Sequence, residues 1–468
     1  MAKNVGLLGV RFTAERVERS LLGRETWRPF PRASEREKWD ALDAETRKRL
    51  VQAAEKHLGR SWEELPATLF LEYRREGNRS RYEQRHFARR RALAELVLGE
   101  CAEGKGRFLD DVVNGVWALC EESFWGVPAH NARHSPHFPE SGLPDTSFHE
   151  VDLFAAETGA LLAWTHYLLV EQLGQELPVV PARILREVQQ RILAPYNTVD
   201  DWRWLGHARR PVNNWNPWIH SNVLACTLLL EEDAAIRTAT VQRVIRWLDV
   251  FLEGYHSDGG CDEGPGYWGR AGASLFDCLE WLHSASGGEL DSYDDALIQE
   301  IGRYIYRVHI GDAWYVNYAD ASAKVYLEGN LVHRYGKRIG DALMMAQGAY
   351  AVSQAGAPWG RQSIGRDLPA LFNQVALRHA EATPPLIRDA WLDGIQVLAA
   401  REREGTADGL LLSTKGGHNA ESHNHNDGGN FVVAVDGHPV VIDVGVETYT
   451  RKTFSTHRYD IWTMQSWR

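Results

Sequence analysis

The stretch ATVQRVIRWLDVFLEGYHSDGG, residues 239–260, predicts the architecture of most of the chain. Apolar residues recur in it every three or four positions, the spacing of a helix that buries one face. Glycine follows at the position where such a helix usually ends. The stripe and the terminating glycine are Val241, Val244, Ile245, Leu248, Phe251, Leu252 and Gly254.

The same helical spacing recurs from about residue 34 to about residue 380. Further segments of this kind are 151–174, 181–196, 218–233, 272–288 and 295–310. Short turns rich in Gly, Pro or Asp join most of them, so consecutive helices should pack antiparallel as hairpins. Residues 1–384 are therefore predicted to form an incomplete (α/α) toroid of helical hairpins.

The pattern changes near ATPPLIRDAW, residues 382–391, and becomes alternating. Strands are expected at 410–414, 431–435 and 440–444, with Asp436-Gly437 as a hairpin turn between the last two. Residues 385–468 should therefore begin an antiparallel β-sheet or sandwich domain. With so few strands and unpaired edges, this domain looks truncated.

The hydrophobic content, net charge and cysteine count indicate which class of protein this is and which partners are excluded. The 468 residues are 44% hydrophobic and 25% charged, as in a soluble globular protein of two domains. The net charge of −11 argues against a nucleic-acid partner. Five cysteines without a CxxC pair argue against a disulfide framework, and the N-terminus lacks the apolar run of a signal or membrane span. We expect a cytoplasmic protein without a membrane partner, and a homodimer is compatible with the sequence.

The segment SHNHNDGGNF, residues 422–431, carries two histidines one residue apart. In an extended segment His423 and His425 point to the same side, and the following hairpin brings Asp443 back towards them. Imidazole and carboxylate groups from adjacent strands are the beginning of a zinc-type site, which needs at least a third ligand. The alternative is an ordinary loop in which His423 and Asp427 satisfy backbone groups.

Two earlier segments concentrate polar and aromatic groups. RPVNNWNPWIHSN, residues 210–222, crowds amides and indoles at a helix start, a combination that suits a sugar site. HSDGGCDEGPGYWGR, residues 256–270, breaks the chain after a long helix and exposes Asp262, Glu263 and Tyr267. The alternative for this second segment is a plain connection between helices with a packed tyrosine.

Several spaced motifs together resemble those of the heparinase II/III-like polysaccharide lyases. They are, in chain order across residues 120–468, NNWNPW, DGGCDEGPGYW, SHNHNDGGNF, VVIDVG and RYDIW. The resemblance implies an α/α toroid followed by antiparallel β-sheets. It also implies β-elimination at a uronic acid of an acidic oligosaccharide or polysaccharide, of glycosaminoglycan or alginate type, which leaves an unsaturated uronate end.

The resemblance also implies roles for individual residues. Asn213 resembles the amide that neutralises the uronate carboxylate, with Asn214 and Asn216 as close competitors. Tyr267 resembles the tyrosine that protonates the leaving oxygen, and His423 the histidine that takes the C5 proton. The expected substrate-binding residues are His130, Asn214, Trp215, Asn216, Arg270 and Tyr459.

His425 and Asp443 match the metal ligands of the family, usually assigned to a structural zinc ion. The family's third ligand is a histidine further along the sequence, and His457 lies too early to replace it. Two other functions stay open. One is a toroid glycoside hydrolase that uses Asp262 and Glu263 as a carboxylate pair. The other is a carbohydrate-binding protein without catalysis.

Overall fold

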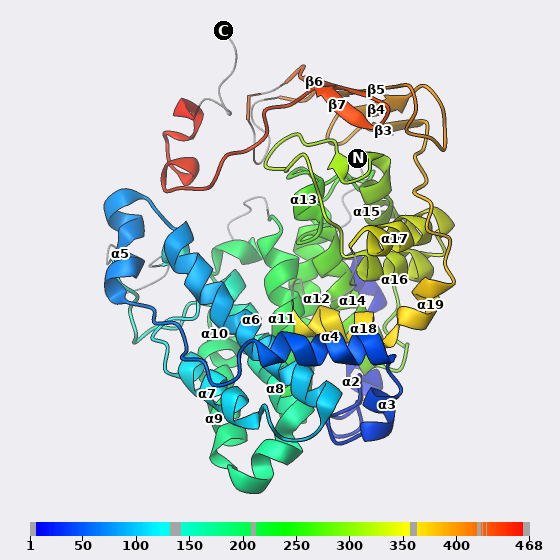
Figure 1. Cartoon of the computed structure of the whole chain (residues 1–468). Coiled ribbons are helices and arrows are strands. Elements are labelled where there is room, and N and C mark those ends of the chain that lie inside the picture. Colours follow the sequence, from blue (N-terminus) through cyan, green and yellow to red (C-terminus); the bar gives the residue numbers. More distant parts are fainter. Residues whose placement is uncertain are drawn as a thin grey trace.

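A body of helices carries a small antiparallel sheet at one end (Figure 1). The computed structural model describes residues 6–131, 142–206, 212–355, 363–418, 423, 425–426 and 428–461. Asp427, part of the loop alternative for the histidine motif, lies outside these residues.

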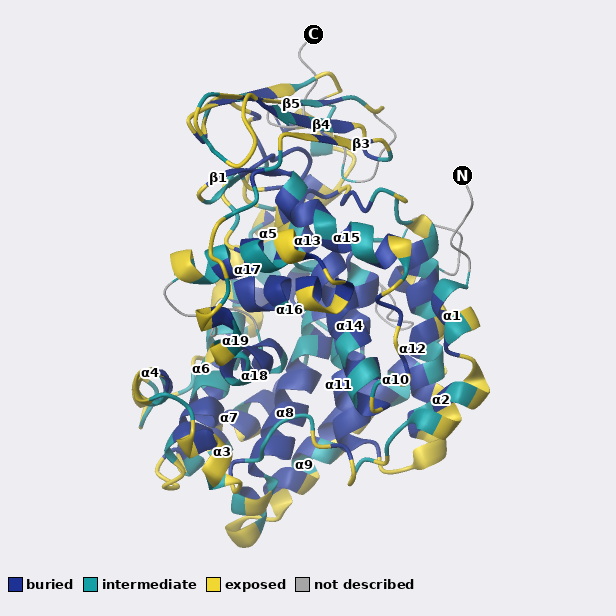
Figure 2. Ribbon diagram, turned by 90° about the vertical axis from the view of Figure 1, so that its right-hand side faces the viewer, coloured by how far each residue is buried: buried dark blue, intermediate teal, exposed yellow. Residues whose placement is uncertain are grey.

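Helical hairpins build the body, as the sequence predicted. The inner helices are α6 (Ser80–Glu103), α8 (Leu153–Glu176), α11 (Trp215–Leu230), α14 (Gly272–Ala285), α16 (Gly329–Ile339) and α18 (Ile364–Phe372). Each contacts the next, and α18 returns to α8, so the helices surround a common axis. The central helices α8, α11 and α14 are largely buried (Figure 2).

Each of the first five inner helices packs against the helix that follows it in the sequence. These partners are α7 (Leu109–Cys120), α9 (Val179–Val188), α12 (Ala234–Gly254), α15 (Ala296–Arg307) and α17 (Ala342–Ala355). Helix α12 contains the apolar stripe from Val241 to Leu252: the Asp233 side chain caps its start, and it ends at Gly254. The other helices are α1 (Leu7–Arg11), α2 (Ala14–Ser20), α3 (Arg36–Asp40), α4 (Ala44–Glu55), α5 (Ala67–Glu76), α10 (Ala194–Thr198), α13 (Pro265–Trp268) and α19 (Gln374–Arg378).

Helix α8, one of the inner helices, is both long and apolar. Its length and mean hydropathy of 1.2 would allow it to cross a membrane, but 83% of that window is buried inside the protein. Its apolar character is therefore that of a core helix, surrounded by α6, α9, α11 and α18.

Buried histidines make the stability of the protein depend on pH. Burial lowers the pKa of His220 to about 3, and those of His166 and His309 to about 4. The unfolded chain therefore binds more protons than the folded chain below the ordinary value of 6.5, and stability is lost as the pH falls through this range.

Between about pH 6.5 and about pH 5, the free energy of unfolding of the wild type should fall by about 2 kcal/mol more than that of His220→Gln. The reason is that glutamine does not titrate. Glutamine can keep the hydrogen bond that His220 Nδ1 makes to Asn216 Oδ1 at 3.0 Å. Chemical denaturation at both pH values measures the difference. Equal acid losses in the two proteins would show that His220 does not contribute.

The sheet is a meander with the strand order β3-β4-β5-β6-β7. Its strands are β3 (Asp389–Leu392), β4 (Val397–Arg401), β5 (Leu410–Lys415), β6 (Phe431–Val435) and β7 (His438–Val441). Asp436 and Gly437 both have positive φ, 48° and 78°, as a two-residue type I′ hairpin turn requires. The strand predicted at 440–444 instead ends at Val441, so Asp443 lies beyond it, and β3 and β4 were not predicted.

A two-stranded ribbon, β1 (His309–Gly311) and β2 (Trp314–Tyr315), joins the sheet to the toroid. The buried Arg401 guanidinium on β4 donates to the His309 carbonyl at 2.7 Å and to the Ile310 carbonyl at 3.4 Å. Gly311 approaches Gly437 so closely that a Cβ at Gly311 would lie 2.9 Å from the Gly437 Cα. These contacts hold the hairpin turn of the sheet over the end of the toroid.

Candidate active site

A cleft of about 350 Å³ brings together side chains from distant parts of the sequence. Asn213, Tyr267 and His423, the three predicted catalytic residues, all line it. The segment that follows β7, residues 442–461, runs from the sheet back over the toroid towards α5 (Figure 1). We call it the crossing segment; its Tyr449 and Phe454 complete the cleft wall.

The three asparagines at the start of α11 have different hydrogen-bond partners and therefore different roles. Asn213 Oδ1 accepts a hydrogen bond from the Trp215 amide at 3.2 Å, so its amide NH₂ group is left to donate into the cleft. Asn214 is buried and donates to the Glu263 carboxylate. Of these two, Asn213 is thus the better placed to meet a substrate carboxylate.

Asn216 is a structural residue, in contrast to the substrate-binding role expected for it. It is fully buried and does not line the cleft. Its Nδ2 donates to the carbonyls of Trp204 at 3.2 Å and Trp247 at 3.1 Å, and its Oδ1 faces His220. These bonds tie the start of α11 to its neighbours and use the polar atoms of the amide.

Tyr267 is positioned by the short helix α13. Gly264, with φ of 86°, precedes this helix, and a Cβ there would lie 2.6 Å from the Ala321 side chain. Glycine therefore allows the loop of residues 318–321 to pack against α13. The Tyr267 hydroxyl donates to the Tyr449 hydroxyl at 3.0 Å, and burial raises the pKa of Tyr267 to about 12, so the phenol is protonated near neutral pH.

His423 lies between two buried carboxylates. Its Nε2 is 2.8 Å from Glu263 Oε1 and its Nδ1 is 2.9 Å from Asp320 Oδ2. Burial alone would lower the pKa of His423, but the Glu263 charge and the hydrogen bonds to both carboxylates raise it to about 10. In this arrangement both ring nitrogens carry protons, so the ring has no lone pair for a substrate proton. The role of base stays a prediction that requires the ring to leave one carboxylate.

Asp320 organises this part of the site, although no sequence pattern marks it. Besides His423, its carboxylate accepts from His425 Nε2 at 2.7 Å and from Arg458 of the crossing segment at 3.0 Å. Burial opposes the charged form, but these three partners hold the pKa of Asp320 well below its ordinary value. Ala319 and His423 both have positive φ, 61° and 56°, so the backbone is strained on both sides of the Asp320–His423 contact.

Two other predicted substrate-binding residues line the cleft. His130 Nδ1 is 2.5 Å from the Asp152 carboxylate, and its ring stacks on Phe154 with centroids 5.4 Å apart. The Trp215 ring lies against His130, with centroids 4.5 Å apart. Together they form an aromatic wall of the kind that stacks on sugar rings.

Arg270 and Tyr459 do not line the cleft, in contrast to their predicted role. The Arg270 guanidinium pairs with Glu157 at 3.2 Å and lies 4.1 Å from the centroid of the Trp218 ring. This ion pair places Arg270 in the wall of a different cavity. Tyr459 is 41% exposed on the crossing segment. His457, also on this segment, is exposed and pairs locally with Asp460 at 2.8 Å.

Two arginines outside the predicted site residues contribute positive charge to the cleft. Arg79 lines it and pairs with Glu83 at 2.5 Å. Arg203 is exposed at the rim and, within the described part of the chain, has no hydrogen bond or ion pair. No local pattern marks these residues, because single arginines before a helix or in a loop are common.

The predicted metal ligands are both buried but have different partners. His425 Nδ1 is buried and has no hydrogen-bond partner among the described residues, as expected of a ligand atom. The Asp443 carboxylate accepts from the Asn430 side chain and, at 2.6 Å, from the Gly445 amide. A further group of ligand atoms, from Glu263, Asp320 and His423, lies within 4.8 Å of one another, but hydrogen bonds already join it. Zinc at His425 and Asp443 stays a prediction, which the zinc content of the wild type and of His425→Ala tests.

The fold matches solved structures. Heparinase III superposes with a TM-score of 0.54 and 13% identity, over 87% of this chain and 55% of the heparinase III chain. A second heparinase III, with methylated lysines, gives a TM-score of 0.52 and 14% identity, over 89% and 60%. This chain has the fold of heparinase III. The predicted toroid followed by an antiparallel sheet is thereby confirmed.

The present chain spans between 55% and 60% of the length of these two heparinase III structures. Its sequence matches no model of a known protein family and no curated protein. The likeness to heparinase III is therefore one of fold.

Proposed function

We propose that this protein is a polysaccharide or oligosaccharide lyase that cleaves uronate-containing glycans by β-elimination. The observation that carries the proposal is the meeting of Asn213, Tyr267 and His423 in one cleft. They come from three distant segments, in a chain with the heparinase III fold. An amide donor, a protonated phenol and a cationic imidazole around one sugar ring suit this reaction.

The reaction removes the C5 proton of a uronic acid and expels the oxygen at C4. Removal of the proton places negative charge on the carboxylate, which an amide donor such as Asn213 stabilises as the charge develops. The departing oxygen needs a proton, which the Tyr267 hydroxyl can supply because a phenol with a pKa of about 12 still carries its proton near neutral pH. Arg203 and Arg79 add the positive charge that an acidic glycan needs at an acidic protein.

While His423 is bound to both Glu263 and Asp320, it contributes positive charge to the cleft and cannot act as a base. It can take the C5 proton only after its ring loses one proton and turns away from Glu263 or Asp320. The 2.8 Å contact to Glu263 provides a route for that proton. If zinc is bound at His425 and Asp443, it would stiffen the sheet against the toroid.

A panel of uronate oligosaccharides, including glycosaminoglycan and alginate types, tests the proposal through the ultraviolet absorbance of a C4–C5 unsaturated uronate. New reducing ends without absorbance would instead indicate a hydrolase. The carboxylate pair for that reaction is poorly placed, since Glu263 faces His423 whereas Asp262 is exposed and does not line the cleft. Binding without product would indicate a carbohydrate-binding protein.

Asn213→Ala should lower kcat by about 10²–10³, the effect of removing one donor to a developing anion. Asn216→Ala is the matched control, since it deletes a neighbouring amide that does not line the cleft. We expect the control to lower the free energy of unfolding and to leave kcat of the folded fraction close to wild type. The absorbance assay and denaturant unfolding measure both effects. If both variants lose kcat equally, Asn213 has no special role.

A further inference from the structure

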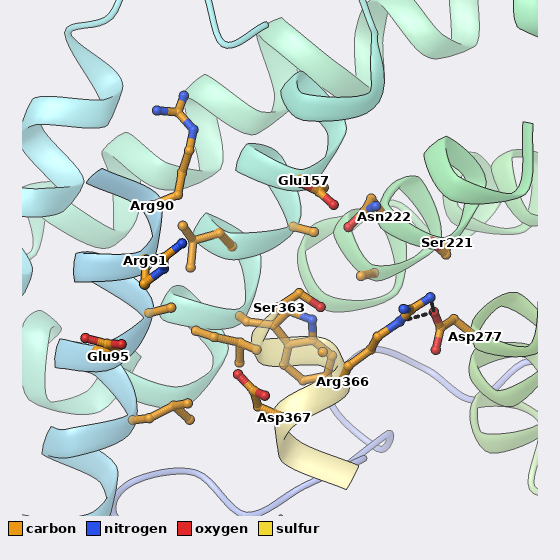
Figure 3. Close-up of a pocket in the computed structure, with 18 of the residues that line it drawn as sticks. Arg90, Arg91, Glu95, Glu157, Ser221, Asn222, Asp277, Ser363, Arg366 and Asp367 are labelled. Atoms are coloured by element: carbon orange, nitrogen blue, oxygen red, sulfur yellow. Dashed lines mark hydrogen bonds and ion pairs between the residues drawn. The ribbon is translucent and has the colours of Figure 1, made fainter. Parts of the chain in front are cut away.

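A second and larger cavity lies inside the toroid, with a volume of about 550 Å³. We call it the inner chamber. Helices α4, α6, α8, α11, α14 and α18 line it, together with Arg270 from the connection before α14. Arg90, Arg91 and Glu95 of α6 lie on one side of it, and Ser221, Asn222 and Asp277 lie on the other (Figure 3). Arg91 is exposed, so the chamber is open to solvent on the α6 side.

A thin partition separates the inner chamber from the cleft. Phe154 lines both cavities, and Trp218 lines the cleft side. The Glu157 carboxylate accepts from Trp218 Nε1 at 2.8 Å and from Arg270 at 3.2 Å, which fixes Arg270 over the indole ring. Arg270, predicted from the sequence to meet an acidic sugar, therefore presents its guanidinium to the chamber.

The chamber wall combines aromatic rings with small residues. The Trp164 and Trp281 rings lie 5.4 Å apart between centroids, and Phe87 and Phe154 add further rings. The space beside them exists because the neighbouring positions are small: Ala53, Ala94, Ala160, Ala225 and Gly365. Flat apolar rings next to open space are the usual platform for the apolar face of a sugar.

The charges in the chamber are balanced but not all paired. Four arginines face four carboxylates: Arg90, Arg91, Arg270 and Arg366, with Glu95, Glu157, Asp277 and Asp367. Arg366 and Asp277 bind each other, and Arg90 binds Glu122 outside the chamber. Within the described residues Arg91 makes no ion pair or hydrogen bond, and Asn222, which donates to the Trp218 carbonyl, leaves its Oδ1 without a donor.

We propose that the inner chamber is a second binding site, separate from the cleft, for a short saccharide that carries a single carboxylate. The carboxylate would pair with Arg91, the hydroxyl groups with Asn222 and the wall carboxylates, and one ring face with the tryptophans. A phosphate or another multiply charged anion is disfavoured, since Arg90, Arg270 and Arg366 are already paired with carboxylates and Arg91 is left as a single cation to meet it. A wholly apolar ligand would leave the polar wall groups without partners.

Calorimetric titration of the full chain with glucuronic acid tests this site, with glucose and inorganic phosphate as comparison probes. Ala94→Phe places a ring in the chamber, and Arg91→Gln removes its unpaired cation from an exposed position where folding should not suffer. Arg85→Gln is the matched control: it removes an exposed arginine from the same helix that does not line either cavity.

The wild type and Arg85→Gln should bind glucuronic acid in the chamber. Arg91→Gln should weaken that binding by about tenfold or more, the loss of one charge-assisted hydrogen bond. Ala94→Phe should remove the chamber site while turnover in the cleft persists. Isotherms of both chamber variants that superimpose on the wild type would overturn the proposal, as would glucose or phosphate binding as tightly as glucuronic acid. The test measures binding alone, so its failure would leave the proposed lyase reaction untouched.

Discussion

Replacement of Tyr267 by phenylalanine should nearly abolish turnover, with a fall in kcat of about 10²–10⁴, the usual contribution of a positioned proton donor. The substitution removes only the hydroxyl that donates to Tyr449 at 3.0 Å and leaves the ring in place on α13. Substrate binding should weaken only modestly. The absorbance assay gives kcat, and titration of the inactive variant with substrate gives its affinity.

Tyr326→Phe is the control for this variant. Tyr326 is 68% exposed and does not line the cleft, so its hydroxyl should have no effect on kcat. Full activity in Tyr267→Phe would remove the phenol from the mechanism. Loss of binding together with activity would show that the hydroxyl holds substrate rather than transfers a proton.

Arg366→Met should cause the largest loss of stability, about 3–5 kcal/mol, because it leaves buried carboxylates without their cation. Arg366 of α18 binds Asp277 of α14 at 2.6 Å and Glu328, which precedes α16, at 2.7 Å. The guanidinium and the Asp277 side chain are 7% and 10% exposed, so water cannot replace the lost partner. These contacts hold α18 where the ring of inner helices closes on α8.

Denaturant unfolding measures this loss. Arg388→Met is the matched control, since its pair with Asp389 is 3.8 Å long and both side chains are more than half exposed. Surface pairs of this kind contribute between zero and about 1 kcal/mol. A similar, small effect of both substitutions would show that the buried network does not stabilise ring closure.

Local patterns in the sequence predicted those parts of the fold that local forces decide. Helix α12 and strand β6 were predicted because their apolar spacing continues over the whole element, and the Asp436-Gly437 turn because type I′ geometry needs these residues. β3 and β4 were missed because they are short and their apolar residues mix with alanine and charge. The alternating apolar residues continue past Val441 to Ile442 and Val444, which are exposed. The alternation therefore did not show that β7 ends at Val441.

The candidate site was predictable only where residues carry a motif. Asn213, Tyr267 and His423 lie in recognisable segments, and the structure brings them to one cleft. Asp320, which is 103 positions from His423 in the sequence, contacts it only through tertiary packing of the loop at residues 318–321. The sequence left Asn214 and Asn216 as close competitors of Asn213, because the roles of these amides depend on partners such as Glu263 and the Trp247 carbonyl.

The stoichiometry of product formation tests the central claim most directly. Each bond cleaved by β-elimination yields one unsaturated uronate and one new reducing end. We therefore predict that wild-type protein acting on a uronate oligosaccharide gives equal amounts of the two, and that Asn213→Ala and Tyr267→Phe lose both together. Reducing ends that accumulate without an equal gain in absorbance would contradict the account.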